Sequence, residues 1–136
     1  MQLFYISNSE SQKLEGEEFN HCVNVLRKKV KDKIFFTDGI GNLFKATISN
    51  INKNSCDLEE LEKLRSEKKN SYNHIGVSII KSQSRLEWMI EKLTEIGIDE
   101  ISLIHSNNCE RNKINLQRLY KKSISAIKQC NSLFLP

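Results

Sequence analysis

Short apolar runs typical of β-strands alternate with turn residues over about the first 65 positions of the chain. The clearest pair of runs, residues 33–37 and 43–48, flanks a turn that contains Gly39 and Gly41. Because glycine readily adopts the positive φ of a tight connection, this pattern predicts a β-hairpin. Similar runs predict two more strands, at residues 3–6 and 55–58.

Helical spacing interrupts these strands at residues 17–27. Four apolar side chains lie there at i, i+3, i+4 and i+7, namely Phe19, Cys22, Val23 and Leu26. The spacing predicts a short amphipathic helix, and strands around one helix suggest a small β-barrel. Residues 59–70 leave two alternatives open, because their Glu, Lys and Leu favour helix whereas a barrel would continue with a strand and a linker.

The second half of the chain follows the order strand, helix, strand, helix. Residues 74–80 are almost continuously apolar, which is typical of a strand buried on both faces of a parallel sheet, and residues 100–104 form the next strand. Ser84 and Glu87 match a capping box, so a helix is predicted to begin at Ser84 and to end at Gly97. Its core stripe consists of Leu86, Met89, Ile90 and Leu93.

A second helix is predicted from about Leu116 to Asn131, with Leu119, Tyr120, Ile124 and Ile127 on its apolar face. The polar run 67–71 separates the two patterns. We therefore expect an α+β protein with a β domain at residues 1–67 and an α/β domain at residues 73–136.

Composition narrows the class of protein without deciding its function. A hydrophobic fraction of 38% and a mean hydropathy of -0.49 describe a globular chain, and no stretch has the ~20 apolar residues of a membrane helix. With no signal peptide at residues 1–6, the expected location is the cytoplasm. The four cysteines lack C-x-x-C spacing, so we expect free thiols and no metal site. A net charge of +4 permits an RNA partner but does not require one.

Several polar residues could carry chemistry. Arg85, Trp88, Lys92 and Glu95 recur along one edge of the first predicted α/β helix, where they suit phosphate and base contacts. The alternative is a half-buried tryptophan beside a solvated charged face. Two polar loops, residues 81–84 and 105–111, follow the predicted parallel strands at the sheet edge where α/β proteins place ligands. Each loop could equally be a solvent-facing connection.

Basic residues also follow the predicted helix of the first domain. Arg27, Lys28 and Lys29 could interact with the negative end of the helix dipole or bind phosphate, and His21 reads as a helix-surface histidine. On the last helix, Gln129 belongs to a polar stripe with Arg118, Lys122 and Ser125, a pattern most typical of a solvated surface.

Four segments together resemble the RsmE-type 16S rRNA (uracil-N3)-methyltransferases. Residues 85–101 are similar to the family pattern R-x-E-x-x-x-x-K-x-T-E-x-G-x-x-x-I, and residues 21–27 to its H-x-x-x-V-L-R. Residues 109–111 resemble its S-E-R, with Cys109 in place of serine, and residues 126–130 its A-x-x-Q-[CS]. The resemblance extends along nearly the whole chain.

This resemblance implies a PUA-like RNA-binding β-barrel followed by the opening βαβα of a SPOUT-type α/β domain. It implies a homodimer that acts on 16S rRNA of the small ribosomal subunit, away from membranes, with S-adenosylmethionine as methyl donor. The family's glycine-rich knot motifs are not found in these 136 residues. We therefore expect the donor site to lie beyond residue 136 and this chain alone to be inactive.

The resemblance also implies roles for individual residues. Arg85 and Arg111 are the catalytic candidates, because a cation can stabilise the charge that develops on the uracil ring. The RNA-binding candidates are His21, Arg27, Lys28, Lys29, Lys81 and Lys92. Glu95 and Glu110 would orient these cations and Gln129 would line the pocket, without a metal. The rival interpretations are a non-catalytic RNA-binding module and an α/β interaction domain that binds no RNA.

Overall fold

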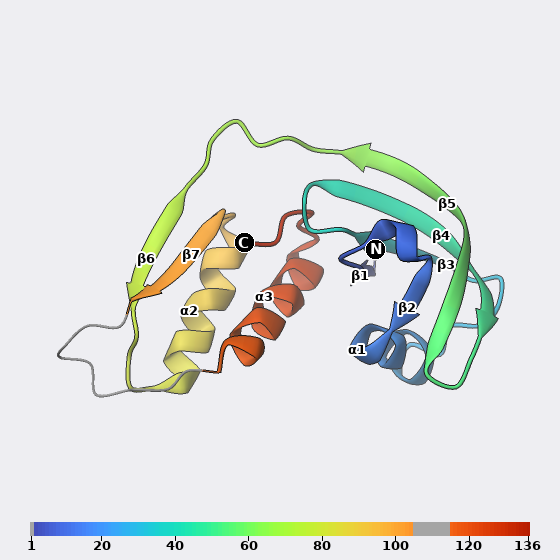
Figure 1. The fold of residues 1–136 in the computed structure, drawn as a ribbon, viewed down its shortest axis with the longest axis horizontal. Helices are drawn as coiled ribbons and strands as arrows, with labels where there is room; N and C mark the ends of the chain where they lie inside the picture. The colour runs from blue at the N-terminus through green and yellow to red at the C-terminus, as the bar shows by residue number, and fades with distance from the viewer. Residues whose placement is uncertain (1, 105–114) are drawn as a thin grey trace. The chain divides into compact units, whose positions relative to one another are not determined.

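A computed structural model describes residues 2–104 and 115–136 of the chain. The chain divides into two compact units, Met1–Lys68 and Lys69–Pro136 (Figure 1). The expectations for Arg111, Glu110 and Cys109 lie outside the described residues.

Unit 1 is a curled five-stranded sheet with strand order β1-β3-β4-β5-β2 (Figure 1). Its strands are β1 (Leu3–Tyr5), β2 (Lys13–Glu15), β3 (Lys33–Thr37), β4 (Asn42–Ile51) and β5 (Ser55–Ser66). β1 is parallel to β3, and the other neighbours are antiparallel. The four predicted strands are confirmed. β2, which follows a short 3-10 helix at Ser9–Ser11, was not predicted, because three residues carry no readable alternation.

The predicted hairpin is formed by β3 and β4. Gly39 and Gly41 have φ values of 81° and 105°, as a tight connection requires. The side chain of Asp38 completes the turn, because its Oδ1 accepts the Ile40 N–H at 3.0 Å and its Oδ2 accepts from Asn42 Nδ2 at 2.7 Å. Local sequence therefore determines this connection.

Residues 59–66 continue strand β5, which resolves the two alternatives for this segment in favour of a strand. Pairing with β4 satisfies their backbone groups and outweighs their helix propensity. The register between β4 and β5 shifts along the ladder, and Glu60 has a φ of 54°, so the pairing accommodates a bulge.

The predicted helix at residues 17–27 is confirmed in part. It begins as a short α-helix, α1 (Gly16–Phe19), and continues as a π-helix, Asn20–Val25. It ends two residues earlier than predicted, and Arg27 adopts a φ of 56°. Its predicted apolar face does point inward, since Phe19 and Cys22 are buried.

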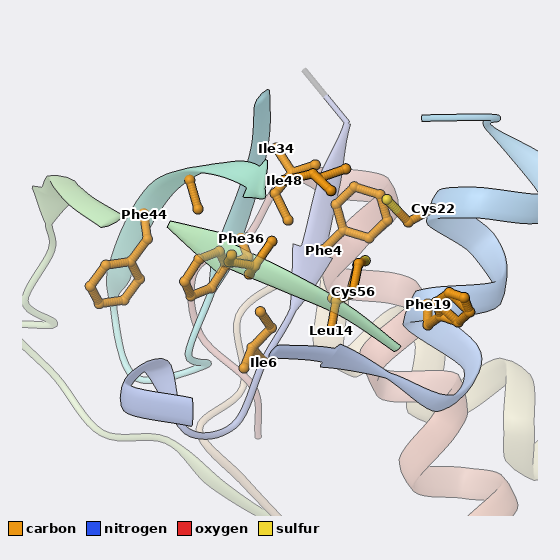
Figure 2. Close-up of a cluster of buried hydrophobic side chains, with 12 residues drawn as sticks. Phe4, Ile6, Leu14, Phe19, Cys22, Ile34, Phe36, Phe44, Ile48 and Cys56 are labelled. Atoms are coloured by element: carbon orange, nitrogen blue, oxygen red, sulfur yellow. The ribbon is translucent and has the colours of Figure 1, made fainter. Parts of the chain in front are cut away.

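The core of unit 1 lies between the curled sheet and this helix (Figure 2). Phe36 stacks on Phe44 with ring centroids 5.0 Å apart. Cys22 and Cys56 are both buried free thiols, and the pKa of Cys22 lies above its ordinary range because it shares a hydrogen bond with Cys56 and is buried. The buried cluster consists of Phe4, Ile6, Leu14, Phe19, Cys22, Ile34, Phe36, Phe44, Ala46, Ile48, Cys56 and Leu58.

Unit 2 has the predicted order strand, helix, strand, helix. Its elements are β6 (His74–Ser78), α2 (Gln83–Glu95), β7 (Glu100–Ile104) and α3 (Leu116–Cys130). β6 and β7 pair in parallel. The expectation that the first strand is buried on both faces is wrong, because within β6 only Val77 is buried, whereas His74 and Ser78 are exposed. A Cβ atom on Gly76 would lie 2.8 Å from Cδ1 of Ile104, so glycine allows that side chain to cross β6.

The cap of α2 lies two residues before the predicted one. Ser82 is the N-cap, and its Oγ accepts the backbone N–H of Arg85 at 3.3 Å. Ser84 lies inside the first turn, so the predicted capping box with Glu87 is not formed. The predicted core stripe of α2 is confirmed, with Leu86 and Ile90 buried and Met89 and Leu93 half-buried. Gly97, with a φ of 91°, follows the end of the helix as expected.

The inward face of α3 is rotated from the predicted one. Leu119 and Ile127 are buried as expected, but Ser123 and Ala126 are buried with them. Tyr120, predicted on the apolar face, is 48% exposed. Small residues occupy this face because α3 packs closely against α2.

Polar contacts hold the amino ends of β6 and β7. Lys69 Nζ donates to Asp99 Oδ1 at 2.6 Å and to the Gly97 carbonyl at 2.9 Å, while Asp99 Oδ2 accepts the Asn73 N–H. Beside them, Glu100 accepts from Tyr72 and lies 3.2 Å from Nδ1 of His74. Among the described residues, no helix is long and apolar enough to span a membrane.

Candidate nucleic-acid interface

The carboxyl ends of β6 and β7 meet at one edge of the parallel sheet. Because each strand leads into a helix, α2 and α3 both begin at this edge (Figure 1). α2 begins after the Ser82 cap and α3 after Asn115, whose Oδ1 accepts the N–H of Arg118 at 3.1 Å. Ligand sites of open α/β sheets form at this edge, so its side chains are the first candidates in unit 2.

Basic residues gather at this edge. Segments 78–88 and 115–122 contain a single carboxylate, that of Glu87. Their cations are Lys81, Arg85, Arg118, Lys121 and Lys122. This excess produces a positive potential that suits a polyanion such as RNA.

Glu87 and Arg118 form an ion pair that joins α2 to α3, with Arg118 Nε donating to Glu87 Oε1. The glutamate side chain is 8% exposed and the arginine side chain 61% exposed. Sequence reasoning missed this pair. Its partners lie on different helices, and the only local signal was a carboxylate next to the apolar stripe of α2.

The predicted residues of α2 occupy two different parts of the helix. Arg85 lies in the first turn, where it is exposed. Trp88 is 61% exposed, so the interpretation of a half-buried tryptophan is wrong. Lys92 and Glu95 lie in the last turns and pair with each other at 3.3 Å. Glu95 is about 15 Å along the axis from Arg85, since each helical residue rises about 1.5 Å.

Gln129 also lies away from the cationic edge. It occupies the last turn of α3, whereas the edge is formed by the first turn of that helix. Lys81 does lie at the edge, exposed in the connection between β6 and α2. The structure therefore brings Lys81 and Arg85 to one edge and places Lys92, Glu95 and Gln129 toward the other end of the helices.

The candidates in unit 1 lie at the start of the π-helix, which contains His21, and in the basic loop that follows it. The half-buried His21 ring lies 5.7 Å from the ring of Phe4. Arg27 and Lys29 are exposed, and the backbone N–H of Lys28 donates to the Cys22 carbonyl at 3.0 Å. The Lys29 N–H donates to Asp32 Oδ2 at 2.7 Å, which holds the backbone of this basic loop.

Comparisons with known proteins give the same division of the chain into two parts. A family model described as an RNA methyltransferase PUA domain matches residues 14–61. A second, described as an RNA methyltransferase domain, matches residues 67–136. Together with the strand and helix order, these matches confirm the predicted fold class of a PUA-like barrel followed by the opening of a SPOUT-type domain.

Curated relatives and solved structures carry related names. Ribosomal RNA small subunit methyltransferase E of Rickettsia conorii is 30% identical over 129 residues, which cover 95% of this chain and 52% of the relative. Its counterpart in Buchnera aphidicola is 26% identical and matches 90% of this chain and 51% of its own length. The chain thus spans about half the length of these relatives.

The crystal structure of a probable rRNA-methyltransferase from Porphyromonas gingivalis has a TM-score of 0.83 at 36% identity, covering 100% of this chain and 58% of that one. A ribosomal RNA small subunit methyltransferase E from Neisseria gonorrhoeae, bound to S-adenosyl methionine, has a TM-score of 0.75 at 24% identity and shares the fold over 100% of this chain and 59% of its own. The RNA methyltransferase domain model matches just over half of the residues of the chain. This chain therefore belongs to the RNA methyltransferase family, beside the small-subunit rRNA methyltransferases E.

Proposed function

We propose that this chain serves the methylation of N3 of a uridine in 16S rRNA of the small ribosomal subunit, with S-adenosylmethionine as the methyl donor, and that its part in the reaction is to bind the rRNA and the reacting base. The observation that carries the proposal is the cationic edge of unit 2, in a chain whose relatives are named small-subunit rRNA methyltransferases. The donor is proposed because two solved structures of the same fold are described as bound to it.

The reaction would form a bond between uracil N3 and the methyl carbon that S-adenosylmethionine supplies, while the sulfur–methyl bond breaks to release a neutral thioether and the N3 proton passes to water. Negative charge spreads over the uracil ring when N3 loses its proton. Arg85 is exposed at the cationic edge, and its guanidinium can stabilise that charge while Lys81 binds a neighbouring phosphate. Arg111 is proposed for the same catalytic role on family resemblance alone.

The residues of the cationic edge fit RNA better than they fit the methyl donor. A sulfonium carries a positive charge, and Arg85, Arg118 and Lys81 would repel it. We therefore assign these side chains to the RNA and none of the described residues to the donor.

We propose that unit 1 binds the rRNA at positions distant from the reacting base. Its basic loop, Arg27 to Lys29, and the neighbouring His21 are the contacts we propose. We propose that Lys92 binds a phosphate of a longer stretch of RNA and that Glu95 orients this lysine. Gln129 keeps its proposed pocket-lining role, and Glu110 is proposed as a second orienting carboxylate. We also propose a homodimer that acts in the cytoplasm, as the family resemblance implies.

Disrupting the gene tests the function directly. We expect 16S rRNA from the disrupted strain to lose one N3-methyluridine, detected by mass spectrometry of nuclease digests. The intact gene should restore it, and a gene carrying Arg85→Ala should not. An unchanged set of methylated uridines would overturn the proposal, and if the purified chain still bound rRNA, it would favour the non-catalytic RNA-binding module.

A further inference from the structure

The position of Arg118 in α3 is unfavourable for the helix itself. It is the third residue after the Asn115 cap, in a first turn that contains no acidic residue. The amino end of a helix carries partial positive charge, so a cation there destabilises the helix. Helix stability therefore does not explain why an arginine stands at this position.

The burial of Glu87 makes the arginine important for the charge of the glutamate. A carboxylate that is 8% exposed remains ionised at low cost only when a charged or hydrogen-bonding partner compensates for its desolvation. Arg118 is that partner and uses only its Nε, one of the five N–H donors of a guanidinium, for the carboxylate. Because the arginine side chain is 61% exposed and only its Nε contacts the carboxylate, its remaining donors are accessible to a ligand from solvent.

We propose that Arg118 binds a backbone phosphate of the RNA at the cationic edge, and that Glu87 is a positioning residue that fixes its guanidinium there. The inference rests on the proposed function and adds a phosphate contact to it. A phosphate is favoured over an acidic protein partner because a guanidinium held through Nε presents parallel donors that match phosphate oxygens. Arg85 occupies the same position after the cap in the neighbouring helix α2, so each of the two helices has an arginine in its first turn at the cationic edge.

Binding of protein-free small-subunit rRNA to the purified chain, measured over a range of KCl concentrations, tests the inference. Arg118→Ala should weaken binding about tenfold, the effect of losing one charge-assisted hydrogen-bonded contact. It should also lower the slope of log affinity against log salt by about 0.7, the value for one phosphate contact on a single strand. Arg118→Lys keeps the charge but loses the fork, and should bind weakly as well.

Glu87→Gln separates positioning from charge. This variant makes the edge more positive, so a simple charge effect would tighten RNA binding. If Glu87 positions Arg118, binding weakens instead, and Glu87→Gln combined with Arg118→Ala is no weaker than Arg118→Ala alone. Tighter binding by Glu87→Gln would overturn the positioning role. Thermal unfolding of each variant shows whether weaker RNA binding comes from misfolding. If Arg118→Ala is misfolded, the RNA binding of Arg118→Lys decides.

Arg65→Ala is the matched control, because Arg65 is a similarly exposed arginine that pairs through Nε with Glu67 at 3.0 Å. It removes the same charge from unit 1. If Arg65→Ala weakens binding as much as Arg118→Ala, only net charge matters and the inference is overturned. If the wild-type chain does not bind rRNA at all, the proposed function itself fails, an outcome that differs from a failure of the Arg118 variants alone.

Discussion

The two units bury their apolar side chains to different extents. In unit 1, Phe4, Phe36 and Ile48 are completely buried inside a closed cluster. In unit 2, the cluster centres on Val77, Leu86, Ile90 and Leu119, and many of the side chains around it are only half-buried. The difference follows from architecture, because a curled five-stranded sheet encloses an interior, whereas one face of a two-stranded sheet cannot.

Unit 2 has directional polar contacts between its elements in addition to this core. Lys69, Asp99 and Asn73 connect the segment before β6 to the start of β7, and the Glu87–Arg118 pair joins the two helices. Such contacts contribute less than apolar burial, and they depend on pH and salt. Polar contacts between elements therefore supplement a less completely buried core in unit 2, whereas the core of unit 1 is the larger source of its stability.

The largest effect is expected from Phe36→Ala in unit 1. Phe36 is fully buried and stacked on Phe44, so its truncation should lower the free energy of unfolding of unit 1 by about 3–5 kcal/mol. Hydrogen exchange of the β3 and β4 amides in urea measures the loss. Ile40→Ala, in an exposed turn position of the same unit, should change it by less than about 0.5 kcal/mol. Equal losses would contradict the core described here.

Leu86→Ala tests the smaller core of unit 2. Leu86 is fully buried in α2, and its truncation should cost about 2–4 kcal/mol, measured by hydrogen exchange of the α2 amides. Leu93 lies on the same face but is half-buried, so Leu93→Ala should lower the free energy of unfolding by only about 1–2 kcal/mol. If Leu93→Ala costs as much as Leu86→Ala, the helix is rotated from the observed orientation.

The corrected helix cap predicts a difference between two neighbouring serines. Ser82→Ala should destabilise unit 2 by about 1 kcal/mol, because it removes the acceptor for the Arg85 N–H. Ser84→Ala should cost less than about 0.5 kcal/mol, since alanine is favoured inside a helix. Urea unfolding followed by helical circular dichroism measures both. The opposite ranking would restore the cap predicted from sequence.

The smallest expected effect is that of pH on the Lys69–Asp99 contact. The ammonium of Lys69 and the backbone N–H of Asn73 hold the pKa of the Asp99 carboxyl below its ordinary value of 3.8. The stabilisation is therefore complete above the pKa of the unfolded state and is lost as pH falls through the lower pKa of the folded state. Below about pH 4 the urea midpoint of unit 2 should fall in the wild type and change less in Asp99→Asn. Identical pH profiles for the two proteins would show that this contact contributes nothing.

Local signals in the sequence were reliable where one residue type determines the backbone. Gly39, Gly41 and Gly97 adopt positive φ values at the predicted hairpin and helix end. The stripe of α2 that includes Leu86 and Ile90 was also readable, because its spacing matches one helical face.

Sequence patterns were insufficient where partners distant in sequence decide the structure. Residues 59–66 left helix and strand open, because their composition favours helix, and pairing with β4 makes them a strand. The spacing between Ser84 and Glu87 predicted a cap at Ser84. In the structure Glu87 pairs with Arg118 instead, and Ser82 is the cap. The face of α3 was assigned by its large apolar residues, although close packing on α2 selects Ser123 and Ala126.

For the candidate site, the sequence identified the edge better than the contacts. The polar loop after the first parallel strand, residues 81–84, predicted the position of Lys81 at this edge of the sheet, and Arg85 follows the loop in the first turn of α2. Their helical spacing also grouped Lys92 and Glu95 with Arg85, although a straight helix separates its two ends. No local pattern could reveal the pair between Glu87 and Arg118, since tertiary packing alone brings the two helices together.

The pairing of β2 with β5 has a consequence for the rate of folding. It joins Lys13–Glu15 near the start of unit 1 to Ser55–Asp57 near its end, and thereby closes the sheet only after most of the unit has been synthesised. Forming contacts between residues so distant along the chain costs the entropy of closing a long loop before these contacts stabilise the fold. We expect unit 1 to refold more slowly than the helices of unit 2, despite its better-buried core.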